Sequence, residues 1–217
     1  MNFTSKLKSN PYIIAEIGIN HNGYLSLAKK LMYESKKAGA DAVKFQKRDL
    51  DKIYSKSILQ DCNSAEWNFE YLIPILKSVE FGTEEYRTIN KKCKELNIDL
   101  IVTPFDENSA EFINTLDLSA IKIASADMTN LPLIEKCASF NLPLIISTGM
   151  WSHNDIKDCV KFYKKLGIDY SLLLTNSTYP TPFETINLEY LTELKKLTNR
   201  VGYSGHERGT FIPVAAV

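Results

Sequence analysis

Short apolar, β-branched runs alternate with amphipathic stretches along nearly the whole chain. Seven such runs predict strands, at residues 12–17, 42–45, 100–103, 121–124, 144–147, 171–174 and 201–203. The runs are nearly all apolar rather than alternating with polar residues, which is typical of parallel strands covered on both faces. Strands alternating with helical stretches predict an α/β fold with a parallel sheet.

The helical stretches between these runs have recognisable ends. Ser26 and Thr83 are predicted to cap two helices, and Asn130, followed closely by a proline, is predicted to open a third. Segment 47–82 interrupts the regular alternation. Because it is rich in aromatic residues, we expect it to fold rather than to form a disordered linker.

Two architectures fit this pattern, an open doubly wound sheet and a (β/α)8 barrel. A doubly wound sheet collects ligands in one crevice, whereas a barrel directs every strand end towards one centre. Polar residues end or follow every predicted strand: Glu16, Lys44, Gln46, Thr103, Lys122, Ser125, Ser147, Thr175, Ser177, Ser204 and His206. We therefore predict a TIM-type barrel. Only residues 207–217 follow the seventh strand, so we expect 1–217 to be one incomplete barrel domain of a longer protein, truncated after about seven strands.

Lys44 and Lys122 lie inside or at the end of apolar strands. A desolvated ammonium must lose its proton or find an anion. Hydroxyl groups lie at the neighbouring strand ends, on Thr103, Ser125, Ser147 and Ser204. Lysines and hydroxyls together suit a small ligand that bears both phosphate and carboxylate. Internal pairing of the lysines with Glu16 or Asp127 is the alternative.

Two histidine-containing motifs carry less information by themselves. Residues 20–23, Asn-His-Asn-Gly, are typical of a turn. His206 follows the seventh strand, but one histidine cannot fix a metal ion. Glu16, at the end of the first strand, is as well suited to a structural hydrogen bond as to catalysis.

Composition narrows the class of protein. The 217 residues contain 26 Lys and Arg against 26 Asp and Glu, and 44% are hydrophobic. This balance is that of a folded protein and gives no electrostatic argument for nucleic acid or an anionic membrane as partner. No apolar run approaches the roughly 18 residues of a membrane span. Four widely spaced cysteines predict reduced thiols in a cytoplasmic protein.

Seven motifs follow one another at the predicted strand ends: IAEIGINHNG, AVKFQ, VTPFDENSA, KIASADMTN, IISTGM, STYPTPFETINL and GYSGHERG. Together they resemble the sialic acid (N-acetylneuraminate) synthase family, including its legionaminate, pseudaminate and spore-coat polysaccharide relatives. The resemblance spans residues 12–217. It implies an enzyme that condenses phosphoenolpyruvate with an N-acetylated hexosamine and water, giving a nine-carbon 2-keto sugar acid and phosphate. It also implies a divalent ion, Mn²⁺ or Mg²⁺, and a homodimer.

The resemblance implies a role for each matching residue. Glu16 matches the catalytic carboxylate, and His206 matches one of two histidine metal ligands. The phosphoenolpyruvate-binding positions are Lys44, Thr103, Lys122, Ser125, Ser147, Ser177 and Ser204. The sugar-side positions are Gln46, Asp127 and Tyr179.

Two departures from the family pattern affect these positions. Leu174-Thr175-Asn176 stands where many members read LHC, and Ser204-Gly205-His206 stands where many read SDH. The second change removes an acidic side chain beside the metal site. The second metal histidine and the antifreeze-like carboxyl-terminal domain would lie beyond Val217.

Two other functions stay open. One is a Schiff-base aldolase that uses Lys44 or Lys122 as the nucleophile. The other is a barrel that binds a phosphorylated acid or sugar without catalysis.

Overall fold

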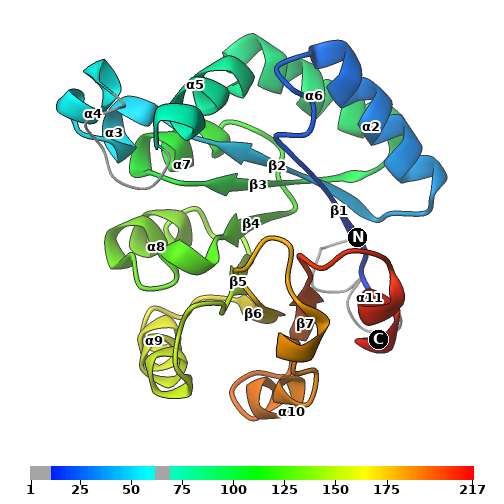
Figure 1. Cartoon of the computed structure of the whole chain (residues 1–217), viewed down its shortest axis with the longest axis vertical. Coiled ribbons are helices and arrows are strands. Elements are labelled where there is room, and N and C mark those ends of the chain that lie inside the picture. Colours follow the sequence, from blue (N-terminus) through cyan, green and yellow to red (C-terminus); the bar gives the residue numbers. More distant parts are fainter. Residues whose placement is uncertain (1–10, 62–68) are drawn as a thin grey trace. The chain divides into compact units, whose positions relative to one another are not determined.

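The computed structural model describes residues 11–61 and 69–217, which fall into two compact units. The first unit contains Tyr12–Ser119 and the second contains Ala120–Val217. Each unit is built from parallel strands with helices beside them (Figure 1). No helix in these described ranges is long and apolar enough to cross a membrane.

The first unit has three parallel strands in the order of the sequence. They are β1 (Ile14–Gly18), β2 (Ala42–Lys47) and β3 (Asp99–Pro104). The helices are α2 (Leu25–Lys37), α3 (Leu50–Ile53), α4 (Lys56–Gln60), α5 (Phe69–Val79), α6 (Thr83–Leu96) and α7 (Glu107–Ile113). The α2 helix packs against β1, β2 and α6, and α6 packs against β3, so these two helices lie side by side along the strands (Figure 1).

The core of the first unit follows from the apolar runs in the sequence. Val43, Phe45 and Val102 on the central strands are fully buried. Met32 of α2 and Ile89 of α6 are buried as well, because each lies on the apolar side of its helix. The strands are therefore covered, and their polar ends stay at the edge of this core.

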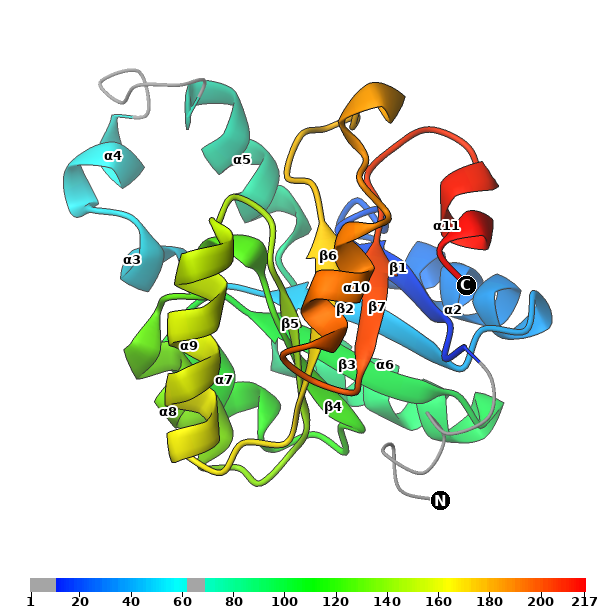
Figure 2. The same cartoon turned by 90° about the horizontal axis from the view of Figure 1, so that it is seen from below.

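The second unit has four parallel strands, also in the order of the sequence. They are β4 (Ala120–Ile123), β5 (Leu144–Ser147), β6 (Tyr170–Thr175) and β7 (Val201–Ser204). The helices are α8 (Leu131–Ala138), α9 (His153–Lys165), α10 (Tyr190–Lys195) and α11 (Phe211–Ala215), with short 3₁₀ turns η2 (Ser125–Asp127) and η3 (Phe183–Thr185). Every residue of β4 and β5 is buried, and α10 packs against β6 and β7 (Figure 2).

The helix starts show where the sequence was informative. Asn130 caps α8 as predicted, since its side chain accepts from the Leu133 N–H. Ser26 and Thr83 were wrong as caps, because both are already helical. Tyr24 is the N-cap residue of α2 and directly follows a hydrogen-bonded turn. Gly82 is the N-cap residue of α6, and its N–H donates to the Glu85 carboxylate at 3.1 Å.

The described residues of segment 47–82 are folded, as its aromatic content predicted, and include helices α3, α4 and α5. Residues 62–68, which include Trp67 of that prediction, lie outside the described residues. The two ends of the segment are tied together, since Lys47 Nζ lies 2.8 Å from Glu80 Oε1.

Candidate functional site

Four of the predicted site residues meet in the first unit. Strand register sets Glu16 level with Lys44, and Gln46 level with Thr103. Lys44 Nζ lies 2.5 Å from Glu16 Oε2 and donates to Thr103 Oγ1 at 3.2 Å. Gln46 Nε2 donates to the other carboxylate oxygen, Glu16 Oε1, at 3.3 Å. We call these four residues the Glu16 cluster.

Lys44 forms an ion pair with Glu16, which is the internal pairing that the sequence left open as an alternative for Lys44. The Lys44 side chain is 13% exposed, whereas that of Glu16 is 45% exposed. A buried ammonium is stabilised by a partner that itself remains in contact with water. The Glu16 carboxylate is thus placed where it can both balance Lys44 and meet a ligand.

Gly18 provides the space that the Glu16 cluster needs. The pairing of β1 with β2 is irregular between Glu16 and Gly18, and Gly18 has a φ of +53°. A Cβ atom there would lie 2.8 Å from Glu16 Oε1 and 3.3 Å from Gln46 Nε2. A larger residue at this position would therefore displace both polar side chains.

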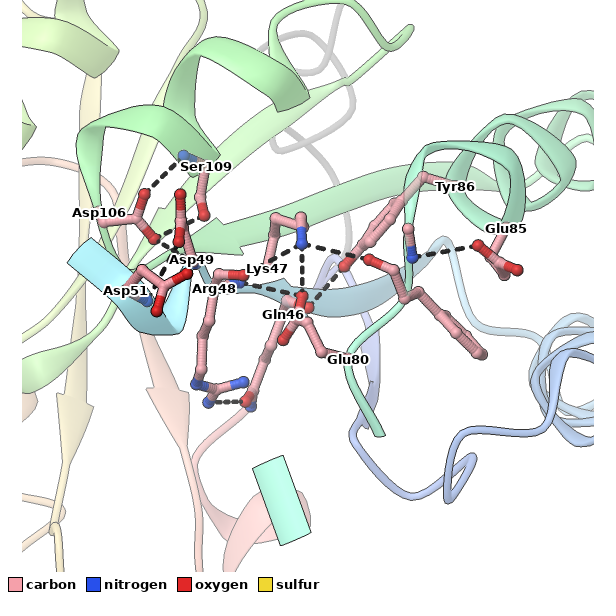
Figure 3. A network of polar contacts seen from close by, with 12 residues as sticks. Gln46, Lys47, Arg48, Asp49, Asp51, Glu80, Glu85, Tyr86, Asp106 and Ser109 are labelled. Atoms are coloured by element: carbon pink, nitrogen blue, oxygen red, sulfur yellow. Dashed lines mark hydrogen bonds and ion pairs between the residues drawn. The ribbon is translucent and has the colours of Figure 1, made fainter. Parts of the chain in front are cut away.

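Arg48 was missed by the sequence analysis, although it follows β2 directly. Its Nη2 donates to Gln46 Oε1 (Figure 3). Its guanidinium lies over the Phe105 ring with 4.0 Å between Cζ and the ring centroid. Its backbone N–H donates to Glu80 Oε1 at 3.1 Å. The signal in the sequence was the basic pair Lys47-Arg48 directly after the predicted strand, where a chain usually turns to solvent.

The second unit holds the other predicted lysine. Lys122, at 5% exposure, donates to Ser147 Oγ and to the Ile123 carbonyl oxygen, both at 2.6 Å. Ser147 is also buried, at 3%. The predicted contact between a strand-end lysine and a strand-end hydroxyl is therefore present in this unit as well.

Two further predicted serines meet at Gly149. The Gly149 N–H donates to Ser125 Oγ at 3.1 Å. A Cβ on Gly149 would lie 2.5 Å from Ser177 Oγ and 2.9 Å from Ser125 Oγ. Both hydroxyls thus occupy the space that a side chain would fill. Trp151 holds the backbone here, because its indole N–H donates to the Ser125 carbonyl oxygen at 2.6 Å.

A cavity of about 540 Å³ opens beside this point in the second unit. Its wall includes Ser177, Asn176, Tyr190 and Tyr203, and every side chain that lines it is uncharged. Met150, which is 70% exposed and has a φ of +74°, also lines it. Hydroxyl, amide and aromatic groups of this kind suit an uncharged ligand that bears hydrogen-bonding groups.

Tyr179 and His206, predicted for different roles, are in direct contact. Their rings stack with centroids 3.9 Å apart, and the Tyr179 hydroxyl lies 2.7 Å from His206 Nε2. His206 Nδ1 lies 2.6 Å from the Asn176 carbonyl oxygen. An Nδ1–H bonded to a carbonyl leaves the Nε2 lone pair for an acceptor role, as in histidines that bind metals.

Glu207 is a second residue that the sequence analysis missed. Its carboxylate oxygens lie 2.5 and 2.6 Å from the place of a Gly205 Cβ, so it fills the direction in which an acidic side chain at 205 would point. Glu207 Oε2 accepts from the Tyr203 hydroxyl at 2.7 Å. Burial, that hydrogen bond and the Glu207 charge raise the pKa of Tyr203. Glu207 therefore places a carboxylate beside Gly205.

The remaining predicted residues lie at strand ends and turns. Ser204 ends β7, level with Thr175 of β6. Asp127 lies in the turn before α8 and accepts from the Asn130 side-chain amide at 3.1 Å. Within the described parts of the chain, no group of three or more His, Cys, Asp or Glu side chains is arranged to hold a metal ion.

Comparison with known proteins gives consistent matches. The profile of the NeuB family matches residues 31–217. The chain is 40% identical to the N-acetylneuraminate-9-phosphate synthase of Drosophila melanogaster, over 99% of this chain and 59% of that protein. It is 39% identical to the N,N'-diacetyllegionaminic acid synthase of Legionella pneumophila, over 95% of this chain and 60% of that protein. The chain thus spans about three fifths of the length of these relatives.

A solved structure gives the same answer for the fold. The N-acetylneuraminic acid synthetase of Leptospira borgpetersenii, in complex with citrate, matches with a TM-score of 0.84 and 33% identity. The match covers 95% of this chain and 69% of that one. The predicted fold class, seven parallel strands of an incomplete TIM-type α/β barrel, is confirmed.

Proposed function

Because the chain belongs to the NeuB family, we propose that it condenses phosphoenolpyruvate with an N-acetylated hexosamine and water. The products are a nine-carbon 2-keto sugar acid of the sialic or legionaminic type and phosphate. The main support is the pair of strand-end lysines, each hydrogen-bonded to a strand-end hydroxyl: Lys44 to Thr103 and Lys122 to Ser147. Such pairs suit a small ligand that carries two anionic groups.

The proposed reaction balances without an oxidant or reductant. The enol carbon of phosphoenolpyruvate forms a bond to the aldehyde carbon of the open-chain sugar, and the aldehyde oxygen takes up a proton. Water then adds to the oxocarbenium-like carbon. The C–O bond to phosphate breaks, so that phosphate leaves and the 2-keto group forms.

Each residue role in this proposal has a physical basis. Lys44 and Lys122 supply positive charge to phosphoenolpyruvate. It is oriented by the hydroxyl groups of Thr103, Ser125, Ser147, Ser177 and Ser204. Glu16, half-exposed beside Lys44, handles the proton at the aldehyde oxygen. The sugar-side residues are Gln46, Asp127 and Tyr179.

His206 fits one ligand position for the proposed Mn²⁺ or Mg²⁺. Its Nδ1 is held by the Asn176 carbonyl, so its Nε2 lone pair becomes available once the Tyr179 hydroxyl moves away. Glu207, which fills the space beside Gly205, supplies negative charge next to it. When bound, the ion would polarise the aldehyde as a Lewis acid.

Three broader features complete the proposal. We expect residues 1–217 to belong to one synthase-type barrel domain, the protein to act as a homodimer, and its location to be the cytoplasm. Cys93, Cys137 and Cys159 are buried free thiols, which supports a reducing compartment. Light scattering of the full-length protein tests the homodimer, since a monomer at micromolar concentration would contradict it.

The deciding experiment measures phosphate release from phosphoenolpyruvate by the full-length protein, with Mn²⁺ and a panel of hexosamines. We expect release only when the sugar is N-acetylated. Release that does not depend on any sugar would contradict the proposal. Borohydride trapping with pyruvate tests the Schiff-base alternative, because an adduct on Lys44 or Lys122 would favour an aldolase. Tight phosphoenolpyruvate binding without turnover by any sugar would favour the non-catalytic barrel.

A further inference from the structure

A continuous set of contacts in the first unit runs from Phe105 to the Glu16 cluster. The Arg48 guanidinium lies over the Phe105 ring, and its Nη2 donates to Gln46 Oε1. The Gln46 amide then donates from its other end to Glu16 Oε1, 3.3 Å away. The second oxygen of Glu16 is taken by Lys44. Gln46 is therefore the link between a cation and a carboxylate.

The backbone of Arg48 is held by two hydrogen bonds. Its backbone N–H donates to Glu80 Oε1, and its carbonyl oxygen accepts from Lys47 Nζ at 3.1 Å (Figure 3). Stacking on an aromatic ring restricts a guanidinium further. Burial lowers the pKa of Arg48, which the charge of Glu80 opposes, and the guanidinium stays protonated at any physiological pH. It is thus a permanent donor.

The chemistry of this contact determines how the Gln46 amide is oriented. A guanidinium has only donors, so Arg48 accepts nothing from Gln46 and bonds only to its oxygen. The NH₂ group must then turn towards Glu16. One of its two N–H groups bonds to Glu16 Oε1, and the second remains as a donor for a bound ligand.

We propose that Arg48 is a positioning residue. It holds the Gln46 amide with its oxygen bonded to the guanidinium and its NH₂ group beside Glu16. Arg48 acts through Gln46 rather than on the substrate. If the proposed function holds, the orientation of the Gln46 amide determines hexosamine binding, because its NH₂ group can donate to an acceptor oxygen of the sugar.

The first test is independent of activity. The chain has only two glutamines, Gln46 and the exposed Gln60, so glutamine labelled with ¹⁵N in its side chain gives two amide pairs in an NMR spectrum. We expect the Gln46 pair to lie away from the free-amide position marked by Gln60. Arg48→Met should shift it towards that position, and Arg48→Lys should shift it less. Arg87→Met, at an exposed arginine of α6, should leave it unchanged. A Gln46 pair that does not move in Arg48→Met would overturn the proposal.

The second test separates positioning from direct contact. Arg48→Met should raise KM for the hexosamine about tenfold, the effect of one charge-assisted hydrogen bond, and leave KM for phosphoenolpyruvate within about twofold. In a Gln46→Leu background the same substitution should add nothing to the hexosamine KM. A further increase there would show that Arg48 acts on the substrate by itself, contrary to the proposal.

The two tests fail in different ways. If the full-length protein releases no phosphate with any hexosamine, the proposed function fails. The amide spectrum still decides whether Arg48 orients Gln46. Thermal unfolding of each variant checks that the fold is retained.

Discussion

Buried lysines next to hydroxyl groups are the residues on which the proposed chemistry depends. Lys122 lies in a strand whose four residues are all buried, and its described contacts include the Ser147 hydroxyl and a carbonyl oxygen. A hydroxyl can rotate to donate or accept, so Ser147 can stay bonded to Lys122 when an anion arrives. An ammonium held in this way offers its charge to a ligand without a large rearrangement.

Replacing Lys122 should therefore act on the anionic substrate. Lys122→Met keeps the length and apolar stem of the side chain but removes its charge. We expect the affinity for phosphoenolpyruvate to fall about 10- to 100-fold, because a hydrogen bond between charged groups contributes about 1.5–3 kcal/mol. Isothermal titration calorimetry measures it. Lys161→Met, at a side chain 78% exposed on α9, is the matched control. Equal affinities of the two variants would contradict the role of Lys122.

Gly149 is the residue on which the arrangement of the two serines depends. A methyl group there would come within 2.5 Å of Ser177 Oγ and within 3.1 Å of the Thr175 carbonyl oxygen. Gly149→Ala should lower the free energy of unfolding by about 1–3 kcal/mol, the usual cost of overpacking. Urea denaturation measures it.

Removing the Ser177 hydroxyl gives the control for Gly149→Ala. The double variant Gly149→Ala with Ser177→Ala should recover part of the lost stability, because the closest contact has gone. Ser177→Ala alone should have little effect on stability. A double variant no more stable than Gly149→Ala would mean that the hydroxyl is not what the methyl group meets.

At the scale of elements, the turn after β1 packs on the end of α5. His21 is 3% exposed, its ring stacks on Phe81 with centroids 4.0 Å apart, and its Nδ1 accepts from the Gly23 N–H. A Cβ on Gly23 would lie 2.4 Å from the Ser78 carbonyl oxygen, so the turn approaches the α5 backbone closely. Residues 20–23 form the turn that the sequence predicted, and the structure adds that this turn packs against α5 and Phe81.

The burial of His21 predicts a pH dependence of stability. Desolvation lowers the pKa of His21 below its ordinary value of 6.5. The unfolded chain then binds a proton more readily than the folded one. The contribution of His21 is thus complete above about pH 6.5 and is lost as the pH falls below it, with a slope of at most about 1.4 kcal/mol per pH unit.

Urea denaturation between pH 7.5 and 5.5 tests this. His21→Gln keeps an acceptor for the Gly23 N–H but cannot titrate, so its stability should fall less with pH than that of the wild type. The difference between the two slopes isolates His21 from the other titrating groups. Parallel slopes would contradict the assignment.

The sequence predicted elements better than contacts. Strand positions follow from apolar runs, which is why β5 has the predicted bounds and β4 differs by one residue. The Lys44–Glu16 pair and the position of Gln46 depend on the register between β1 and β2 and on the bulge at Gly18, which no local pattern encodes. Arg48 and Glu207 were missed although Gln46 and Tyr203, which they contact, lie close in the sequence, because the direction of each side chain depends on how the backbone turns after its strand.

At the scale of the whole chain, the charges balance, and the three cysteines within the described residues are buried. The sequence has a pI of about 6.8, so long-range electrostatics do not direct it towards a polyanion. Cys93 lies in the first unit and Cys137 in the second, and both are buried. Cys93 and Cys137 can therefore report on whether their units are folded.

Burial raises the pKa of Cys93 to about 12 and that of Cys137 to about 12. The thiolate is the reactive form, so at pH 8 both should react with a thiol reagent about a thousandfold more slowly than an ordinary cysteine, and burial should slow them further. Mass spectrometry of the modified peptides measures each rate, and the chain in denaturant gives the unprotected reference. If Cys137 were modified rapidly while Cys93 stayed protected, the second unit would open in native buffer. If Cys93 were modified rapidly while Cys137 stayed protected, the first unit would open. We expect both thiols to be protected, because each lies on the apolar side of its helix. The other buried residues of that helix must unpack before the reagent can reach the thiol.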